Sequence, residues 1–276
     1  MWGKGLGSVL RIAVGTALGL PILLYLMQDR LLFFPQPLRE EDLTRIRSAF
    51  PEAAEISIAA DDGTALRGWL VRHSRDDPSP LLIYFGGNAE EVSWLIQQHA
   101  RLPGWSLLLM NYRGYGASGG KPGETALFAD ALSIYDAMRV RPEFRGERVA
   151  VMGRSLGSGV AVYLASRRPL AGAILVTPYD SITSLAQAHY PYLPVRWLLK
   201  HPFDSLALAP SLRQRALVLA AEQDVVIPPR HARTLYEAWA GPKSWYQLPD
   251  TDHDGISDHP DYWPLIARFL QGIESP

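Results

Sequence analysis

The sequence contains no cysteine, and that absence excludes three kinds of chemistry at once. Disulfide bonds, zinc sites built on thiolates and cysteine nucleophiles all need this residue. Unbalanced charge is also lacking, because 27 Lys and Arg residues nearly offset 28 Asp and Glu residues. A formal net charge of −1 gives no electrostatic reason to expect a nucleic-acid partner. Internal repeats and low-complexity tracts are missing too, and a composition of 47% hydrophobic and 20% charged residues is typical of a globular protein.

An apolar run at the N-terminus departs from this average composition. Residues 12–27 carry no charge, and residues 6–10 extend the run if Arg11 reaches toward the lipid headgroups. This length is near the lower limit of the about 17–25 residues that cross a bilayer. The alternatives are a buried core helix and a cleaved signal peptide, but residues 25–28 are bulky and offer no cleavage site. We therefore expect residues 1–30 to form an uncleaved, single-pass membrane anchor.

The flanking charges do not settle the side of the membrane on which the rest of the chain lies. Lys4 precedes the apolar run, while Arg30 and further arginines mixed with acidic residues follow it. The short N-terminal tail slightly favours an extracytoplasmic domain. Residues 31–54 are expected to form a juxtamembrane connector, because Pro35 and Pro37 prevent a continuous helix there.

Strand-like and helix-like segments alternate from residue 55 to the end of the chain. A first pair of strands flanks the hairpin turn signal at residues 62–63. Six short apolar runs then indicate buried parallel strands, at residues 81–85, 105–110, 149–152, 173–176, 216–220 and 245–248. Helices are expected between them, over residues 89–100, 124–139, 156–167, 230–239 and 260–270. This alternation predicts one α/β domain over residues 55–276, with a mostly parallel sheet and helices on both faces.

A G-x-S-x-G motif lies between one of these strands and the helix that follows it. The motif is Gly153-Arg154-Ser155-Leu156-Gly157. Strand, sharp turn and helix together form a nucleophile elbow, in which the serine projects above the sheet. The two glycines are needed because side chains there would collide with the neighbouring strand and helix. The motif therefore predicts that Ser155 is a catalytic nucleophile.

A serine hydroxyl needs a base to take its proton and an acid to orient that base. In this kind of fold both follow later strands, in the chain order Ser, Asp, His. Asp224 follows the strand at 216–220, and His253 follows the strand at 245–248. We predict these two residues as acid and base, with Glu222 as the nearest substitute acid and His259 as the nearest competing histidine.

Two backbone amides should bind the negative oxygen that forms during acyl transfer. Leu156, directly after the nucleophile, is expected to supply one of them. Asn88 is expected to supply the other, because it follows the early strand at 81–85 through Gly86 and Gly87. Asn88 is also expected to cap the helix after it.

These motifs occur in an order that resembles a known family. The matching segments are residues 31–35, 87–89, 111–119, 153–157, 224–228 and 253–254. They resemble the membrane-anchored α/β-hydrolase-domain family, whose hydrolase domain is serine-aminopeptidase-like. The resemblance implies an α/β-hydrolase fold and a lipid-like acyl, ester or thioester substrate, since some relatives are depalmitoylases that remove fatty acyl groups from proteins. Gly86 and Asn111 depart from the family pattern, which usually has His and Asp at these positions.

Two other motifs compete with this interpretation. Gly114, Gly116 and Gly119 mimic a dinucleotide fingerprint, but residues 121–123 separate them from the next helix, so no cofactor is expected. The oxygen ligands of Asp250, Asp252 and Asp254 fit a calcium-loop spacing. A strand directly before that loop argues against calcium, so a metal there remains a weak alternative.

Residues 178–210 are rich in aromatic residues and proline and are expected to form a small lid over the nucleophile. Tyr179 and Trp197 are our candidates for lining an acyl pocket; a helix pair packed on the core is the alternative. The expected function is hydrolysis of acyl esters, thioesters or related bonds through an acyl-enzyme on Ser155. A small-peptide amidase and a catalytically silent membrane scaffold are the alternatives. The oligomeric state stays open.

Overall fold

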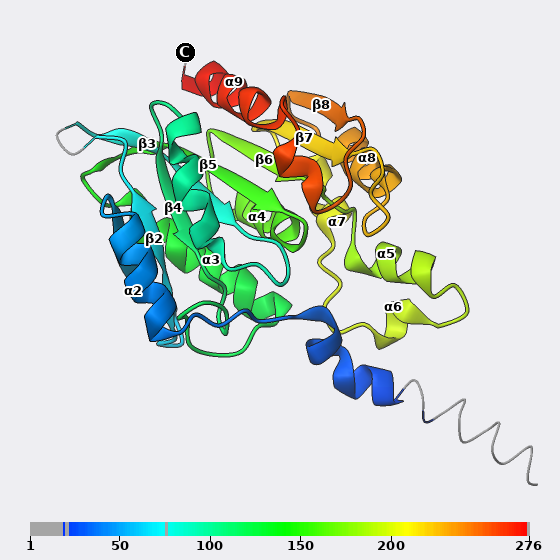
Figure 1. Ribbon diagram of the computed structural model, residues 1–276. Coiled ribbons are helices and arrows are strands. Elements are labelled where there is room, and N and C mark those ends of the chain that lie inside the picture. Colours follow the sequence, from blue (N-terminus) through cyan, green and yellow to red (C-terminus); the bar gives the residue numbers. More distant parts are fainter. Residues whose placement is uncertain (1–18, 20–21, 75–76, 275–276) are drawn as a thin grey trace, which may run out of the picture.

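The computed structural model describes residue 19, residues 22–74 and residues 77–274. Eight strands form one sheet in the order β1-β2-β4-β3-β5-β6-β7-β8 (Figure 1). Their bounds are Ala53–Ala59 (β1), Ala65–Val71 (β2), Ser79–Phe85 (β3), Ser106–Met110 (β4), Phe144–Arg154 (β5), Gly172–Val176 (β6), Arg215–Ala221 (β7) and Lys243–Leu248 (β8). The strands from β4 to β8 pair in parallel, and β1 and β2 add an antiparallel hairpin at one edge. The predicted fold class, an α/β-hydrolase with a mostly parallel sheet, is confirmed.

Helices cover both faces of this sheet. Their bounds are Glu40–Ala49 (α2), Val92–Arg101 (η1), Glu124–Arg139 (α3), Leu156–Arg167 (α4), Ile182–His189 (α5), Val195–Leu198 (α6), Ser205–Leu208 (α7), Ala209–Ser211 (η2), Pro229–Ala238 (α8), Gly255–Asp258 (η3) and Tyr262–Glu274 (α9). Alternate side chains of β3 enter two separate cores. Ile83 belongs to the core that includes residues of α3, α4 and α8, and Tyr84 belongs to the core that includes residues of η1 and α9. Burial on both faces explains the continuous apolar runs that marked the central strands in the sequence.

Two of the predicted elements differ from those observed. β8 is an edge strand in which only Leu248 is buried, rather than a strand covered on both faces. The apolar run 245–248 misled because Trp245 packs on one side only, against Tyr236. The segment after β3 is a 3₁₀ helix, η1, and its cap is Glu91 rather than Asn88, because the Glu91 carboxylate accepts the Ser93 amide. The side chain of Asn88 has other partners.

The predicted anchor lies mostly outside the described residues, which begin with residue 19 and continue from residue 22. Residues 22–32 are helical. In the described part of the chain, no helix combines the length and the apolar character that a bilayer span requires. The segment 31–54 contains no continuous helix, as its prolines predict, but it is more than a connector. It includes α2, and Phe33 is buried in the main core.

Candidate active site

Ser155 lies at the sharp turn between β5 and α4. Its φ of 50° and ψ of −117° are strained for a residue with a side chain, and its amide donates to the carbonyl oxygen of Val176 at 2.9 Å. The two motif glycines allow this turn to form. A Cβ at Gly157 would lie 2.1 Å from the carbonyl oxygen of Phe85, and one at Gly153 would lie 2.2 Å from that of Gly157. The strand–turn–helix geometry that the motif predicts is therefore present.

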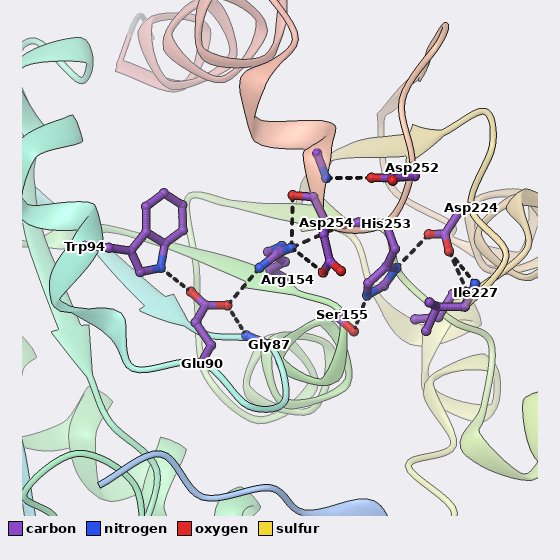
Figure 2. Close-up of polar contacts among 12 residues, drawn as sticks. Gly87, Glu90, Trp94, Arg154, Ser155, Asp224, Ile227, Asp252, His253 and Asp254 are labelled. Atoms are coloured by element: carbon purple, nitrogen blue, oxygen red, sulfur yellow. Dashed lines mark hydrogen bonds and ion pairs between the residues drawn. The ribbon is translucent and has the colours of Figure 1, made fainter. Parts of the chain in front are cut away.

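The structure brings Ser155, His253 and Asp224 together at the carboxyl edge of the sheet (Figure 2). Ser155 Oγ lies 2.9 Å from His253 Nε2, and His253 Nδ1 lies 2.8 Å from Asp224 Oδ2. Asp224 is buried, and its other carboxylate oxygen accepts the amides of Val226 and Ile227 at 2.9 and 2.7 Å. A carboxylate facing Nδ1 fixes the proton on that nitrogen, which leaves Nε2 free to accept the serine proton.

The competing acid and histidine lie elsewhere. Glu222 accepts the amide of Asp250 at 3.2 Å, and His259 Nδ1 accepts the amide of Asp261 at 3.1 Å. No hydrogen bond in the described part of the chain joins either of them to His253 or Ser155. The three residues predicted from the chain order Ser, Asp, His are therefore the ones joined by hydrogen-bond contacts.

Both predicted oxyanion donors are available for a ligand. Across the described ranges, no hydrogen bond uses the backbone amide of Asn88 or of Leu156. The neighbouring amide of Gly87 is occupied, because it donates to Glu90 Oε2 at 2.6 Å. The loop after β3 and the first residue of α4 thus offer two free donors next to Ser155.

Sequence reasoning missed the carboxylate of Glu90, which holds this loop in place (Figure 2). Besides the Gly87 amide, Glu90 accepts the Tyr84 hydroxyl at 2.7 Å and the Trp94 indole N–H at 2.9 Å. Burial, together with the negative charge of Glu90, raises the pKa of Tyr84 well above its ordinary value, so the phenol keeps the proton that it donates. Glu90 therefore fixes the start of the oxyanion loop.

Arg154, the residue before the nucleophile, connects Glu90 to the histidine loop. Its guanidinium lies 3.2 Å from Glu90 Oε2, 3.2 Å from the carbonyl oxygen of His253 and 3.4 Å from Asp254 Oδ1. One side chain thus ties together the oxyanion loop, the elbow and the loop of the base. The sequence contained one signal for this role. Arg154 is a charged residue at the end of an otherwise apolar strand, and a charge buried there needs a partner of opposite charge.

The carboxylates of the possible calcium loop do not converge in this structure. The described residues contain no group of three His, Asp or Glu side chains able to hold a metal ion. Asp252 instead accepts the amide of Gly255 at 2.7 Å, and Asp254 pairs with Arg154. Asp250, Asp252 and Asp254 thus follow the spacing of a calcium loop, but Asp252 caps a turn and Asp254 faces Arg154.

An apolar cavity of about 330 Å³ lies between the helix over residues 22–32 and the lid segment. Its lining residues are Leu24, Tyr25, Gln28, Leu31, Leu32, Ile182, Ala186, Tyr190, Leu193, Val195, Leu198 and Leu199. The predicted pocket residues are not among them. Tyr179 is fully buried and donates its hydroxyl to the carbonyl oxygen of Leu156 at 3.1 Å, and Trp197 is 86% exposed. The lid region does line a cavity, through its aliphatic side chains.

Comparisons with known proteins agree with this fold. A family model described as "Serine aminopeptidase, S33" matches residues 76–216. The chain is 32% identical to the uncharacterized protein Rv2307c of Mycobacterium tuberculosis, over 95% of this chain and 94% of that one. It is 28% identical to the uncharacterized membrane protein YNL320W of Saccharomyces cerevisiae, over 98% and 95%. Among solved structures, the Pyrococcus furiosus esterase Pf2001 superposes with a TM-score of 0.67 at 18% identity, over 87% of this chain and 99% of that one.

Proposed function

Because the chain belongs to the serine aminopeptidase S33 family of α/β-hydrolases, we propose that it is a serine hydrolase acting through an acyl-enzyme on Ser155. The bonds cleaved are acyl esters, thioesters or related bonds. The continuous chain of short contacts from Asp224 through His253 to Ser155 carries this proposal. The name of the esterase with the same fold supports it as well.

The proposed reaction begins when His253 Nε2 takes the proton of Ser155 Oγ and the oxygen attacks the substrate carbonyl carbon. The amides of Asn88 and Leu156 then bind the oxyanion of the tetrahedral intermediate. As the bond to the leaving group breaks, the His253 imidazolium returns the proton to that group. Water, deprotonated by the same imidazole, then attacks the acyl carbon. The bond to Ser155 Oγ breaks, and the imidazolium returns the proton to that oxygen. Asp224 holds the ring and stabilises its positive charge throughout.

A fluorophosphonate probe tests this proposal directly, because such probes react with activated serines. The wild-type chain is expected to be labelled at Ser155, and the Ser155→Ala variant is expected to lose the label completely. Intact-mass measurement of both proteins reads out the result. Unlabelled wild type would favour the alternative of a catalytically silent scaffold with this fold.

The apolar cavity favours a lipid-like acyl group over a small peptide as the substrate. Nine of its twelve lining residues are aliphatic. One of these nine, Leu32, accepts a hydrogen bond from Asn88 in the oxyanion loop through its backbone carbonyl oxygen. In the same labelling assay, an ester of a long fatty acid should slow the labelling of Ser155 more than the matching acetate does. Equal protection by both esters, or stronger protection by a small peptide amide, would remove the argument for an acyl chain.

We also propose that residues 1–30 attach the protein to a membrane as a single-pass anchor. The uncharged run at residues 12–27 and the name of the yeast relative support this proposal. Ile22, Leu23 and Leu26 are exposed apolar side chains on the helix over residues 22–32. A spanning chain is expected to stay in the membrane pellet after alkaline carbonate extraction, whereas a peripheral protein would be released into the supernatant.

A further inference from the structure

Hydrogen bonds tie the side chain of Asn88 to the segment that follows the N-terminal helix. We call residues 31–38 the N-terminal arm. Asn88 Nδ2 donates to the carbonyl oxygen of Leu32 at 2.5 Å, and Asn88 Oδ1 accepts the amide of Phe34 at 3.0 Å. The hydroxyl of Tyr115 closes the arrangement, because it donates to Asn88 Oδ1 at 2.8 Å and accepts the Phe34 amide at 3.0 Å. The amide side chain thus pairs with the arm as a neighbouring strand would.

The N-terminal arm is itself fixed to the core on both sides of this contact. On one side Phe33 is buried, with its ring edge-on to the rings of His201 at 5.1 Å and Phe203 at 6.4 Å. On the other side the arm pairs with Gly116, which donates to the carbonyl oxygen of Gln36 at 2.7 Å and accepts the amide of Leu38 at 2.9 Å. The arm therefore presents a rigid surface to Asn88, because both of its ends are held.

The backbone of Asn88 needs such support. The oxyanion loop leaves β3 at Phe85, and Ala89 has a positive φ of 56°, a conformation that costs free energy in a residue with a side chain. Glu90 fixes the amide of Gly87 before Asn88, but among the described residues the Asn88 amide itself has no acceptor. The Tyr112 hydroxyl holds the loop before Asn88 by donating to the carbonyl oxygen of Gly86 at 2.7 Å. The Asn88 side chain holds the loop at the amide itself, through its contacts with the arm and through Oδ1, which also accepts the Ala89 amide at 3.0 Å.

We propose that the N-terminal arm is a positioning element of the oxyanion hole and acts through the side chain of Asn88. The segment next to the anchor is then a structural component of the catalytic site rather than a tether. This inference rests on the proposed hydrolase function, and it assigns to the Asn88 side chain a role separate from that of its backbone amide. Because donors must lie within about 2.7–3.1 Å of the oxyanion, a small rotation of the loop is enough to weaken transition-state binding.

The test compares three full-length variants. Asn88→Ala removes every contact of the side chain with the arm, together with the acceptor of the Ala89 amide, but keeps the Asn88 amide. Tyr115→Phe removes the bridging hydroxyl alone and is the milder change. Gln97→Ala removes an exposed side-chain amide on η1 and is the control. Each variant is assayed for kcat and KM on a soluble ester, for inhibition by a boronic acid that forms a tetrahedral adduct with the serine, and for thermal unfolding.

Asn88→Ala is expected to lower kcat by about 10–100-fold, somewhat less than the loss of a whole oxyanion donor. The affinity for the boronic acid should fall by the same factor while KM stays constant, and Tyr115→Phe should show a smaller loss of the same kind. Gln97→Ala should match the wild type. Wild-type kcat and boronate affinity in Asn88→Ala would overturn the inference, as would a loss of kcat with unchanged boronate affinity. Both of these results are compatible with labelling of Ser155 in the wild-type protein. Failure of this inference is therefore distinct from failure of the hydrolase proposal.

Discussion

Replacement of His253 by Ala is expected to lower kcat by about 10⁴–10⁶-fold, because the serine hydroxyl loses the base that takes its proton. The imidazole is the only group in hydrogen-bond contact with Ser155 Oγ in the described part of the chain. Its other nitrogen pairs with the buried carboxylate of Asp224, which orients the ring toward the serine. The loss should appear in kcat, with KM nearly unchanged, when both proteins are assayed on one soluble ester.

The matched control for this variant is His259→Ala. His259 belongs to the same loop region, but its ring accepts a backbone amide from Asp261 and does not reach the serine. We expect it to retain most of the wild-type kcat. If His253→Ala kept more than a hundredth of the wild-type rate while folding normally, another group would have to be the base, and the proposed mechanism would be wrong.

Gly157→Ala is expected to lower the free energy of unfolding by about 2–4 kcal/mol, within the range of overpacked positions. In an ordinary helix the same change would stabilise the protein by about 1 kcal/mol, so even the sign of the effect tests the structure. The new methyl group would lie 2.1 Å from the carbonyl oxygen of Phe85 and 2.6 Å from that of Gly86. Both are backbone atoms, which cannot turn aside as a flexible side chain could.

Chemical denaturation of the variant and the wild type measures this change. Gly119→Ala is the control, because a Cβ there would meet its nearest neighbours at 3.8 Å, which is ordinary van der Waals contact. The clash also falls on the residues that lead into the oxyanion loop, so Gly157→Ala should react more slowly with the fluorophosphonate probe. A variant as stable as the wild type would mean that α4 does not pack this closely against β3.

The sequence predicted the parts of the site that follow from local patterns. Ser155 directly follows β5, and Asp224 and His253 lie on the loops after β7 and β8. Because parallel strands end at one edge of the sheet, their order along the chain predicted that the three residues meet. The elbow was predictable as well, because glycine is required where two backbone segments approach closely, as at the two glycines of the motif.

The parts that sequence reasoning missed depend on distant pairings. Glu90 and Arg154 are 64 residues apart, and no sequence motif around either residue predicts the contact between them. The partners of Asn88 lie in a segment that looked like a linker, because two prolines interrupt it, whereas its backbone groups bind loops of the domain. The predicted pocket residues differ from those observed, because aromatic content identifies the lid region but not which side chains face inward. Trp197 points to solvent, and mainly aliphatic residues around it line the cavity.

The position of β8 at the edge of the sheet has a consequence for the protein during its synthesis. His253 follows this strand and lies 98 residues after Ser155, so the nucleophile leaves the ribosome long before its base. Until β8 docks onto β7, the growing polypeptide carries an ordinary, unreactive alcohol. Under the proposed mechanism, acyl transfer through Ser155 therefore begins only when the last strand has been added.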